Sequence, residues 1–285
     1  MKLFSIKELE RLSGVKAHTI RAWELRYSVF TPTRTNANIR LYTIEDLQKL
    51  LHLMVLTENG YRISNLAHLS CNDLGKETQT LCTDHTRMQM AIHQLILYKF
   101  HSDVENLDAV LDSCVYCWGI HTTIENVIVP FLKCTGLLSY QDKSCETHFA
   151  ITAIRRKIIF GFETVQIEHC ERQTALLFLQ EGEHYDLMLL YTAYLLKRCG
   201  IRVLYLGTNV PCRHLKQLIA EKQPQQIYTY IADPKKAKIH ELADYITENY
   251  SGITLSVVTP EIPAAGNESF TFTTIEHLSA SLAHC

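Results

Sequence analysis

A cluster of basic and polar residues near the start of the chain has the types and spacing that nucleic-acid binding needs. A helix in the major groove reads bases through side chains near its N-terminal end, and arginines beside it hold phosphates and fix the register. The residues placed for base contact are Lys16, His18, Thr19 and Arg21, and those placed to flank the helix are Arg34, Asn38, Arg40 and Tyr42. This pattern predicts binding to double-stranded DNA.

The charge distribution favours the same interpretation. Residues 1–70 hold ten Lys or Arg against six Asp or Glu, although the whole chain has a net charge of −2. A local excess of this kind suits phosphate binding when it is clustered on one face. The alternative is an ordinary small helical domain with solvated charges.

A second group of residues has the chemistry of metal ligands but not the number. Cys114, Cys117 and His121 could share one helix face, and Cys134 follows in sequence. Zinc requires about four nitrogen or sulfur ligands, and no second Cys-x-x-Cys completes a site. We therefore interpret these residues as packing residues of helices and predict no metal.

Enzyme signatures are absent from the sequence. It has no GxGxxG, no phosphate-binding Gly-Lys-Ser/Thr, no HExxH and no GxSxG. Glu181, Glu183 and Asp186 surround His184, but charged residues where a helix begins are usually solvated caps. We expect a protein that is not an enzyme.

The elements that must position the basic residues are short helices and a hairpin. A capping box at Ser5–Glu8 begins a helix that ends at Ser13-Gly14, and a second helix covers residues 16–27, which together predict a helix-turn-helix. The turn residues 36–38 lie between two short extended runs and predict a hairpin, the wing. Helices from Thr43 to Asn59 and over 61–69 complete a winged helix-turn-helix over residues 1–71.

This segment resembles the DNA-binding domain of the MerR-type transcription regulators. The family pattern is a helix with Thr-Ile-Arg and an aromatic-Glu pair, then Pro, an Arg-bearing wing and Arg-x-Tyr. The matching residues are Thr19-Ile20-Arg21, Trp23-Glu24, Pro32, Arg34 and Arg40-Leu41-Tyr42. The resemblance implies that Trp23 packs near the DNA backbone and that the protein is a homodimer on a two-fold operator.

The remainder of the chain predicts two further domains of different periodicity. Residues 71–77 are polar and predict a linker; helices at about 78–101, 103–117, 122–134 and 144–165 predict a four-helix bundle over 78–168. From residue 172 to 285, short apolar runs alternate with helical segments, which predicts a doubly wound parallel sheet. The fold class is therefore α followed by α/β in several domains.

This arrangement resembles the cobalamin-sensing repressors of carotenoid genes and the cobalamin module of methionine synthase. The resemblance places His184 where the family histidine ligates cobalt. Gly182 stands at the acidic position and Leu187 at the glycine position that admits the nucleotide tail, and 258–260 replaces the family Gly-Gly. Two interpretations of His184 therefore remain: it binds the cobalt of a cobalamin, or it is a loop histidine in a domain that has lost the cofactor-binding residues.

The bundle departs from the same family pattern. There, a Trp ten positions before a Glu-His pair covers the adenosyl face. His148 matches the histidine, whereas Thr147 replaces the Glu and Leu137 replaces the Trp. We therefore expect no cofactor, with cobalamin at His184 and His148 as the alternative.

The sequence thus predicts a DNA-binding transcription regulator whose C-terminal module mediates oligomerisation or responds to a signal. Two alternatives remain: an adenosylcobalamin-dependent light-sensing repressor, and a corrinoid-carrying methyltransferase subunit. No secretion signal and no uncharged apolar run of roughly 18 residues is present. We expect a cytoplasmic protein that meets no membrane and keeps its thiols free.

Overall fold

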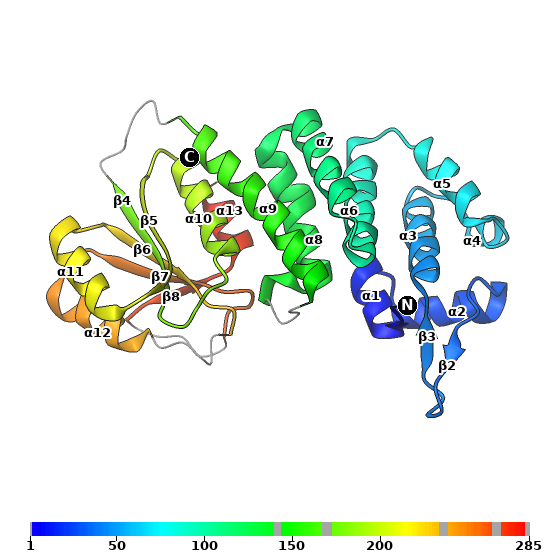
Figure 1. The fold of residues 1–285 in the computed structure, drawn as a ribbon, viewed down its shortest axis with the longest axis horizontal. Coiled ribbons are helices and arrows are strands. Elements are labelled where there is room, and N and C mark those ends of the chain that lie inside the picture. Colours follow the sequence, from blue (N-terminus) through cyan, green and yellow to red (C-terminus); the bar gives the residue numbers. More distant parts are fainter. Residues whose placement is uncertain (1, 140–143, 167–172, 234–238, 264–268, 283–285) are drawn as a thin grey trace. The chain divides into compact units, whose positions relative to one another are not determined.

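The computed structural model describes residues 2–139, 144–166, 173–233, 239–263 and 269–282 (Figure 1). The chain divides into two compact units. The first unit holds residues 1–137 and 142–154, and the second holds residues 138–141 and 155–285. The three-domain division with ranges 1–71, 78–168 and 172–285 stays a prediction.

The first unit begins with a winged helix-turn-helix, as the sequence predicts. Its elements are β1 (Phe4–Ser5), α1 (Ile6–Ser13), α2 (Ala17–Tyr27), β2 (Thr33–Arg34), β3 (Arg40–Tyr42), α3 (Ile44–Glu58) and α4 (Ile63–Leu66). The three strands form an antiparallel sheet in the order β1-β3-β2. The strand β1, which pairs with β3, was not predicted from the sequence. It has only two residues, which are too few to show the alternating pattern of a strand.

Side-chain caps fix where two of these helices begin. Ser5 Oγ accepts the backbone N–H of Glu8 at 3.3 Å, and Glu8 Oε2 accepts the backbone N–H of Ser5 at 2.7 Å. Thr43 and Asp46 make the same reciprocal pair at the start of α3. Each box satisfies two of the backbone donors that a helix start leaves without partners.

The predicted linker at residues 71–77 is wrong, because this segment is the helix α5 (Cys71–Gln79). Ser70 caps it by accepting the backbone N–H of Asp73 at 3.2 Å. Leu74 and Thr78, four residues apart, are buried with exposed fractions of 0% and 1%. The buried face of α5 has only one apolar side chain, Leu74, and one hydroxyl side chain, Thr78. The sequence therefore shows no clear amphipathic pattern that would predict a helix in this polar segment.

The helical bundle follows, with one break in an unexpected place. Its elements are α6 (Asp84–His101), α7 (Val104–Thr123), the π-helical turn η1 (Ile124–Ile128), α8 (Val129–Thr135), the 3₁₀ turn η2 (Leu137–Ser139) and α9 (Cys145–Thr164). The predicted helix over 122–134 is present, but it starts directly after a kink at Gly119 and not at a cap over 122–125, where Thr123 makes no capping hydrogen bond. The break lies at Gly119, whose φ of 76° only glycine adopts readily.

The second unit is a parallel α/β fold. Its strands are β4 (Thr174–Gln180), β5 (Arg202–Val210), β6 (Gln226–Tyr230), β7 (Thr254–Val258) and β8 (Thr271–Thr273), and its helices are α10 (Leu187–Arg198), α11 (Cys212–Lys222), α12 (His240–Asn249) and α13 (Ile275–Leu282). The five strands are all parallel, in the order β5-β4-β6-β7-β8. This order reverses direction beside β4, as in doubly wound sheets, and confirms the predicted fold class.

Helices cover both faces of the sheet (Figure 1). On one face, Leu176 and Phe178 of β4 pack in a core with residues of α11 and α12, among them Ile219 and Ile246. On the other, α10 packs against β4, β5 and α13. Ten consecutive residues of α10, from Leu187 to Leu196, are buried. Strand β4 has a nearly continuous apolar sequence for this reason.

Candidate nucleic-acid interface

The helix-turn-helix is built around a glycine turn and one apolar anchor. Helix α1 ends at Gly14, which has φ 74° and donates its N–H to Glu10 O at 2.8 Å. Helix α2 then starts after Lys16, and its Ile20 is fully buried. Because Ile20 fixes which side of α2 faces inward, the opposite side is left for another molecule.

That opposite side carries most of the predicted base-contacting residues. Lys16, His18 and Arg21 are exposed, and Thr19 is half-buried. Trp23 is half-buried as well. Lys16 Nζ lies 3.4 Å from Glu10 Oε1, but its side chain is 70% exposed, so this surface pair holds it weakly.

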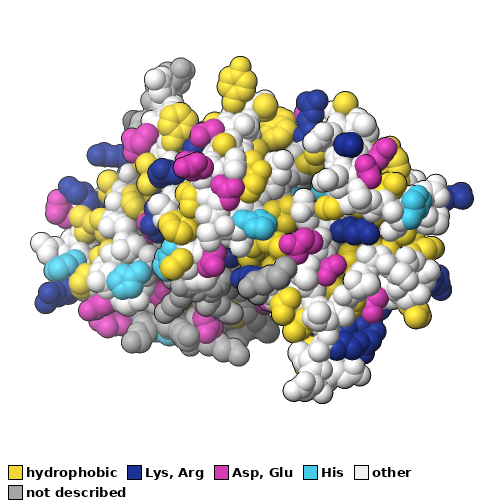
Figure 2. Space-filling model, turned by 45° about the vertical axis from the view of Figure 1, so that its right-hand side comes forward, with side chains coloured by type: hydrophobic (Ala, Val, Ile, Leu, Met, Phe, Trp, Pro, Cys, Tyr) yellow, Lys and Arg dark blue, Asp and Glu magenta, His cyan; other side chains and the backbone are white. Residues whose placement is uncertain are grey.

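The wing is the hairpin of β2 and β3, and it carries three more of the predicted residues, Arg34, Asn38 and Arg40. Arg34 and Arg40 are cross-strand partners. Asn38 takes the left-handed conformation with φ 60°, which asparagine tolerates in tight turns. Its Oδ1 accepts Arg34 Nη1 at 2.6 Å, and both side chains are exposed. Figure 2 shows Lys and Arg side chains gathered on the surface just above the hairpin tip.

A carboxylate of α2 holds the wing, and sequence reasoning did not assign it this role. Glu24 Oε1 accepts Arg40 Nε at 2.9 Å, and Glu24 Oε2 accepts the Tyr42 hydroxyl at 3.0 Å. The Glu24 side chain is only 16% exposed. Burial, reinforced by this carboxylate, raises the pKa of Tyr42. One buried charge thus joins α2 to β3 through two hydrogen bonds, each strengthened by that charge.

This network changes the role of two predicted residues. Tyr42 has an exposed fraction of 0%, so it supports the wing from inside. The Arg40 guanidinium is oriented by Glu24, although 32% of its side chain remains exposed. The residues of this network are part of the MerR pattern in the sequence, because Glu24 belongs to its aromatic-Glu pair and Arg40 and Tyr42 form its Arg-x-Tyr.

His184 lies on the loop that follows β4 at the carboxyl edge of the sheet and is exposed. The loop is pinned to the end of β5: Gly182 N donates to Asn209 Oδ1 at 2.9 Å, and Asn209 N donates to Glu183 O at 3.1 Å. The nearby carboxylate that could orient an imidazole, Asp186, instead accepts from Arg155 Nη2 at 2.6 Å and from the Tyr205 hydroxyl at 3.2 Å. Metal-ligating histidines normally have such a carboxylate partner, so the support expected for a cobalt ligand is engaged elsewhere.

The residues around this loop do not fit a cobalamin with an inserted nucleotide tail. Leu187 and Val258 are both fully buried, and Thr259 has an exposed fraction of 1%. Their side chains pack in the core at positions where the family pattern has glycine. A tail could enter only if these side chains left their packed positions.

His148 is exposed on α9, in the first unit. Its sequence neighbour Thr147 and the residue at the family tryptophan position, Leu137, each have an exposed fraction of 0%. Both replacements face the protein interior. They therefore offer neither the carboxylate nor the aromatic surface that the family pattern places over the adenosyl group.

The cysteines of α7 do not assemble a metal site with their neighbours. Gly119 breaks the helix between Cys117 and His121, so the single face expected from their spacing does not form. His121 Nε2 lies 3.2 Å from Glu125 Oε2. Within the described ranges, no group of three or more His, Cys, Asp or Glu side chains could hold a metal ion. No helix in the same ranges is long and apolar enough to cross a membrane.

Comparison with known proteins finds similarity in the first part of the chain and along most of its length. Residues 4–70 match the family described as MerR HTH family regulatory protein. The chain is 26% identical over 233 residues to the HTH-type transcriptional repressor CarH of Myxococcus xanthus, covering 78% of this chain and 77% of that protein. It is 23% identical over 224 residues to the HTH-type transcriptional repressor CarA of the same organism, covering 78% and 74%.

Among solved structures, the fold is similar to that of the monomethylamine corrinoid protein of Methanosarcina barkeri. The TM-score is 0.57 at 12% sequence identity, and the match covers 69% of this chain and 99% of that chain. At this identity the similarity is one of fold. It confirms the predicted cobalamin-domain-like architecture that follows the winged helix.

Proposed function

Because residues 4–70 are a MerR-type helix-turn-helix domain, we propose that the chain is a transcription regulator that binds a two-fold DNA operator as a homodimer. The observation that carries this proposal is the Glu24 network. It fixes the wing against α2, so that Arg21 and Arg34 belong to one rigid, basic, exposed surface. A surface of this kind neutralises phosphates while the start of α2 meets base edges.

The dimer follows from the size of the reading helix. Helix α2 has 11 residues, and only its first turns carry base-contacting side chains. One such head makes too few contacts for a specific site, whereas two heads on a two-fold axis read two half-sites. The similarity to two proteins named repressors supports repression as the direction of regulation.

For the second unit we propose assembly or signal response without cobalamin. The buried Leu187 and Val258, and the engagement of Asp186 by Arg155 and Tyr205, support this assignment. A signal or partner that binds two assembly states unequally would then change operator occupancy.

The alternative is an adenosylcobalamin-dependent sensor, and the exposed His184 favours it. One measurement, made on the native chain and on a His184→Ala variant, decides between the alternatives. Purified protein is mixed in the dark with adenosylcobalamin or hydroxocobalamin, passed over a gel-filtration column and examined for visible absorbance. Retained absorbance in the native chain that is lost in His184→Ala would establish cobalamin binding through His184, whereas absorbance equal to the buffer control supports the cofactor-free assignment.

DNA binding is tested by selecting duplexes that bind the full chain from a random library and by footprinting the protein on the selected duplexes. We expect a two-fold symmetric footprint, with affinity that falls steeply as salt rises. A monomer that binds a single half-site with the same affinity would contradict the homodimer. Failure to enrich any sequence would contradict operator recognition itself.

A further inference from the structure

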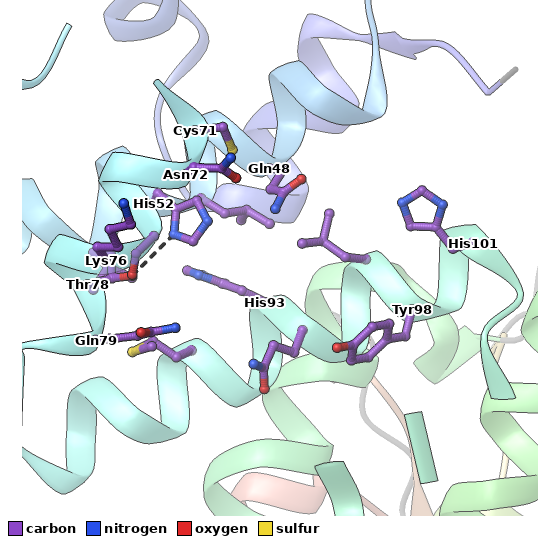
Figure 3. Close-up of a pocket in the computed structure, with 16 residues that line it drawn as sticks. Gln48, His52, Cys71, Asn72, Lys76, Thr78, Gln79, His93, Tyr98 and His101 are labelled. Carbon is purple, nitrogen blue, oxygen red and sulfur yellow. Dashed lines mark hydrogen bonds between the residues drawn. The ribbon is translucent and has the colours of Figure 1, made fainter. Parts of the chain in front are cut away.

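A cavity of about 480 Å³ lies within the first unit, between α3, α5 and α6 (Figure 3). Its volume is in the range of small-molecule sites, roughly 300–1,000 Å³. Its walls combine apolar side chains with a few polar groups, as such sites usually do. The apolar part is formed by Leu51 and Val55 of α3 and by Met90 and Leu97 of α6.

His93 of α6 is the most unusual residue of this cavity. Its exposed fraction is 9%, and no hydrogen-bond partner is found for it in the part of the chain that the structure describes. Burial lowers its pKa to about 3, with a smaller effect of the neighbouring His52. At neutral pH it is thus an uncharged imidazole with one N–H donor and one acceptor nitrogen. A buried polar group without a partner is costly, and here it lines a space that a partner could occupy.

His52 of α3 lies on the other wall, and Figure 3 shows its ring beside that of His93. Its Nδ1 is 3.4 Å from Thr78 Oγ1. The Thr78 hydroxyl already donates to Gly75 O at 2.8 Å, so it can only accept from His52. The network therefore places the His52 proton on Nδ1 and leaves Nε2 as an acceptor. A bound molecule would need a donor for this nitrogen.

The charges around the cavity select against ionised molecules. No Asp or Glu lines it, so a cation would find no counter-charge. Lys76 is the single Lys or Arg that lines the cavity. Its side chain is 78% exposed and its Nζ lies 3.7 Å from Asp73 Oδ1, so it would stabilise a bound anion only weakly. Burial lowers the pKa of His52 as well, so neither ring supplies a positive charge at neutral pH.

We propose that the cavity between α3, α5 and α6 binds a neutral, planar aromatic molecule that carries both an N–H donor and a carbonyl acceptor. Its ring system would lie against Leu51, Val55 and Met90. Its polar edge would meet the free nitrogen of His52 and the imidazole of His93. Lactams fused to aromatic rings have this chemistry.

The site has a direct route to regulation, and this consequence rests on the proposed function. Helix α3 belongs to the domain that carries the wing, and α6 is the first helix of the bundle. A molecule held between them would favour one arrangement of the DNA-binding head against the bundle. Operator affinity would then depend on its concentration.

Acridone tests the proposal, because it is neutral, planar and fluorescent and has an N–H and a carbonyl. The full native chain is titrated with acridone, and we expect saturable binding of one molecule per chain. Gly75→Leu fills the site: a Cβ at Gly75 would lie 3.7 Å from His52 Cε1, and no unusual backbone angle opposes it. Gly75→Ala is the matched control, since it adds one methyl group in ordinary contact.

We expect Gly75→Leu to weaken acridone binding at least about tenfold and Gly75→Ala to leave it within about threefold. His93→Leu keeps the apolar volume and removes both nitrogens, so it should weaken acridone about fivefold and leave the apolar isostere anthracene unchanged. If Gly75→Leu does not fold, the His93→Leu comparison decides alone. Absent acridone binding in the native chain, or equal loss of acridone and anthracene in His93→Leu, would overturn the proposal. DNA binding is measured separately without acridone, so a failure of the proposed function is recognised independently.

Discussion

The Glu24 network makes a quantitative prediction about the stability of the DNA-binding head. Tyr42→Phe keeps the buried ring and removes one hydrogen bond, at 3.0 Å, to an ionised acceptor. Such bonds contribute about 1.5–3 kcal/mol, so we expect the variant to lose about 2 kcal/mol of unfolding free energy. Glu24→Ala removes the bonds to both Tyr42 and Arg40, and we expect a loss of about 3 kcal/mol, because the partly exposed Arg40 recovers solvation.

The double variant separates this network from simple loss of packing. Glu24→Ala and Tyr42→Phe delete the same hydrogen bond, so their combination should cost about 1.5 kcal/mol less than the sum of the single losses. The assay is urea unfolding of chains in a Trp118→Phe background. The chain has two tryptophans, and this change leaves Trp23, next to Glu24, as the fluorescence reporter of the head.

Additive losses would refute the argument. Sites without a shared partner add within about 0.3–0.5 kcal/mol, so a coupling energy inside that range would mean that Glu24 and Tyr42 act independently. A matched control is Tyr42→Phe combined with Ser70→Ala. Ser70 caps α5 by accepting the backbone N–H of Asp73 and shares no hydrogen bond with Glu24 or Tyr42, so this pair should be additive.

Three further predictions concern other parts of the chain. Charge reversal of either Arg21 or Arg34 should weaken operator binding at least about tenfold and should lower, by about one or two, the slope of log affinity against log salt concentration. Charge reversal of Arg202, which is exposed in the second unit, should change neither quantity. Filter binding at several salt concentrations measures both. The pKa of His93 is about 3 in the folded protein and about 6.5 in the unfolded chain, so below pH 6.5 the unfolded state binds one more proton at this residue. The free energy of unfolding should therefore fall as the pH drops from about 6.5 toward 3, by at most about 1.4 kcal/mol per pH unit. Urea unfolding at several pH values measures this slope, which should be smaller in His93→Leu. Gly14→Ala should destabilise the head by about 1–2 kcal/mol, because φ is 74° there and nothing lies within 4 Å of the new methyl group to offset the strain; the same unfolding assay measures it.

The elements with strong local signals could be predicted from the sequence. The capping boxes at Ser5 and Thr43 mark helix starts, and both are present in the structure. The apolar runs of the second unit predicted its strands, because a parallel sheet buries both faces and leaves an uninterrupted apolar pattern. The alternation of strands and helices predicted a parallel, doubly wound sheet, whereas the strand order β5-β4-β6-β7-β8 is known only from the structure.

The errors have a common cause, which is that tertiary contacts override a weak local pattern. Helix α5 looks polar in sequence, and its Leu74 alone does not predict a buried face. Residues 122–125 have the sequence of a capping box, yet the helix passes through them because the chain breaks at Gly119, three residues before this segment. In the interface, exposed Arg21 and Arg34 agree with their predicted positions, whereas Tyr42, predicted to flank the DNA, is buried and donates its hydroxyl to Glu24.

The short strand β1 has a practical consequence for anyone who handles the protein. Phe4 has an exposed fraction of 1% and pairs with Tyr42, and Ser5 both pairs with Leu41 and caps α1. The first few residues are therefore a working part of the wing. A deletion or substitution within these residues would therefore disturb the strand that pairs with the Arg40-bearing strand β3.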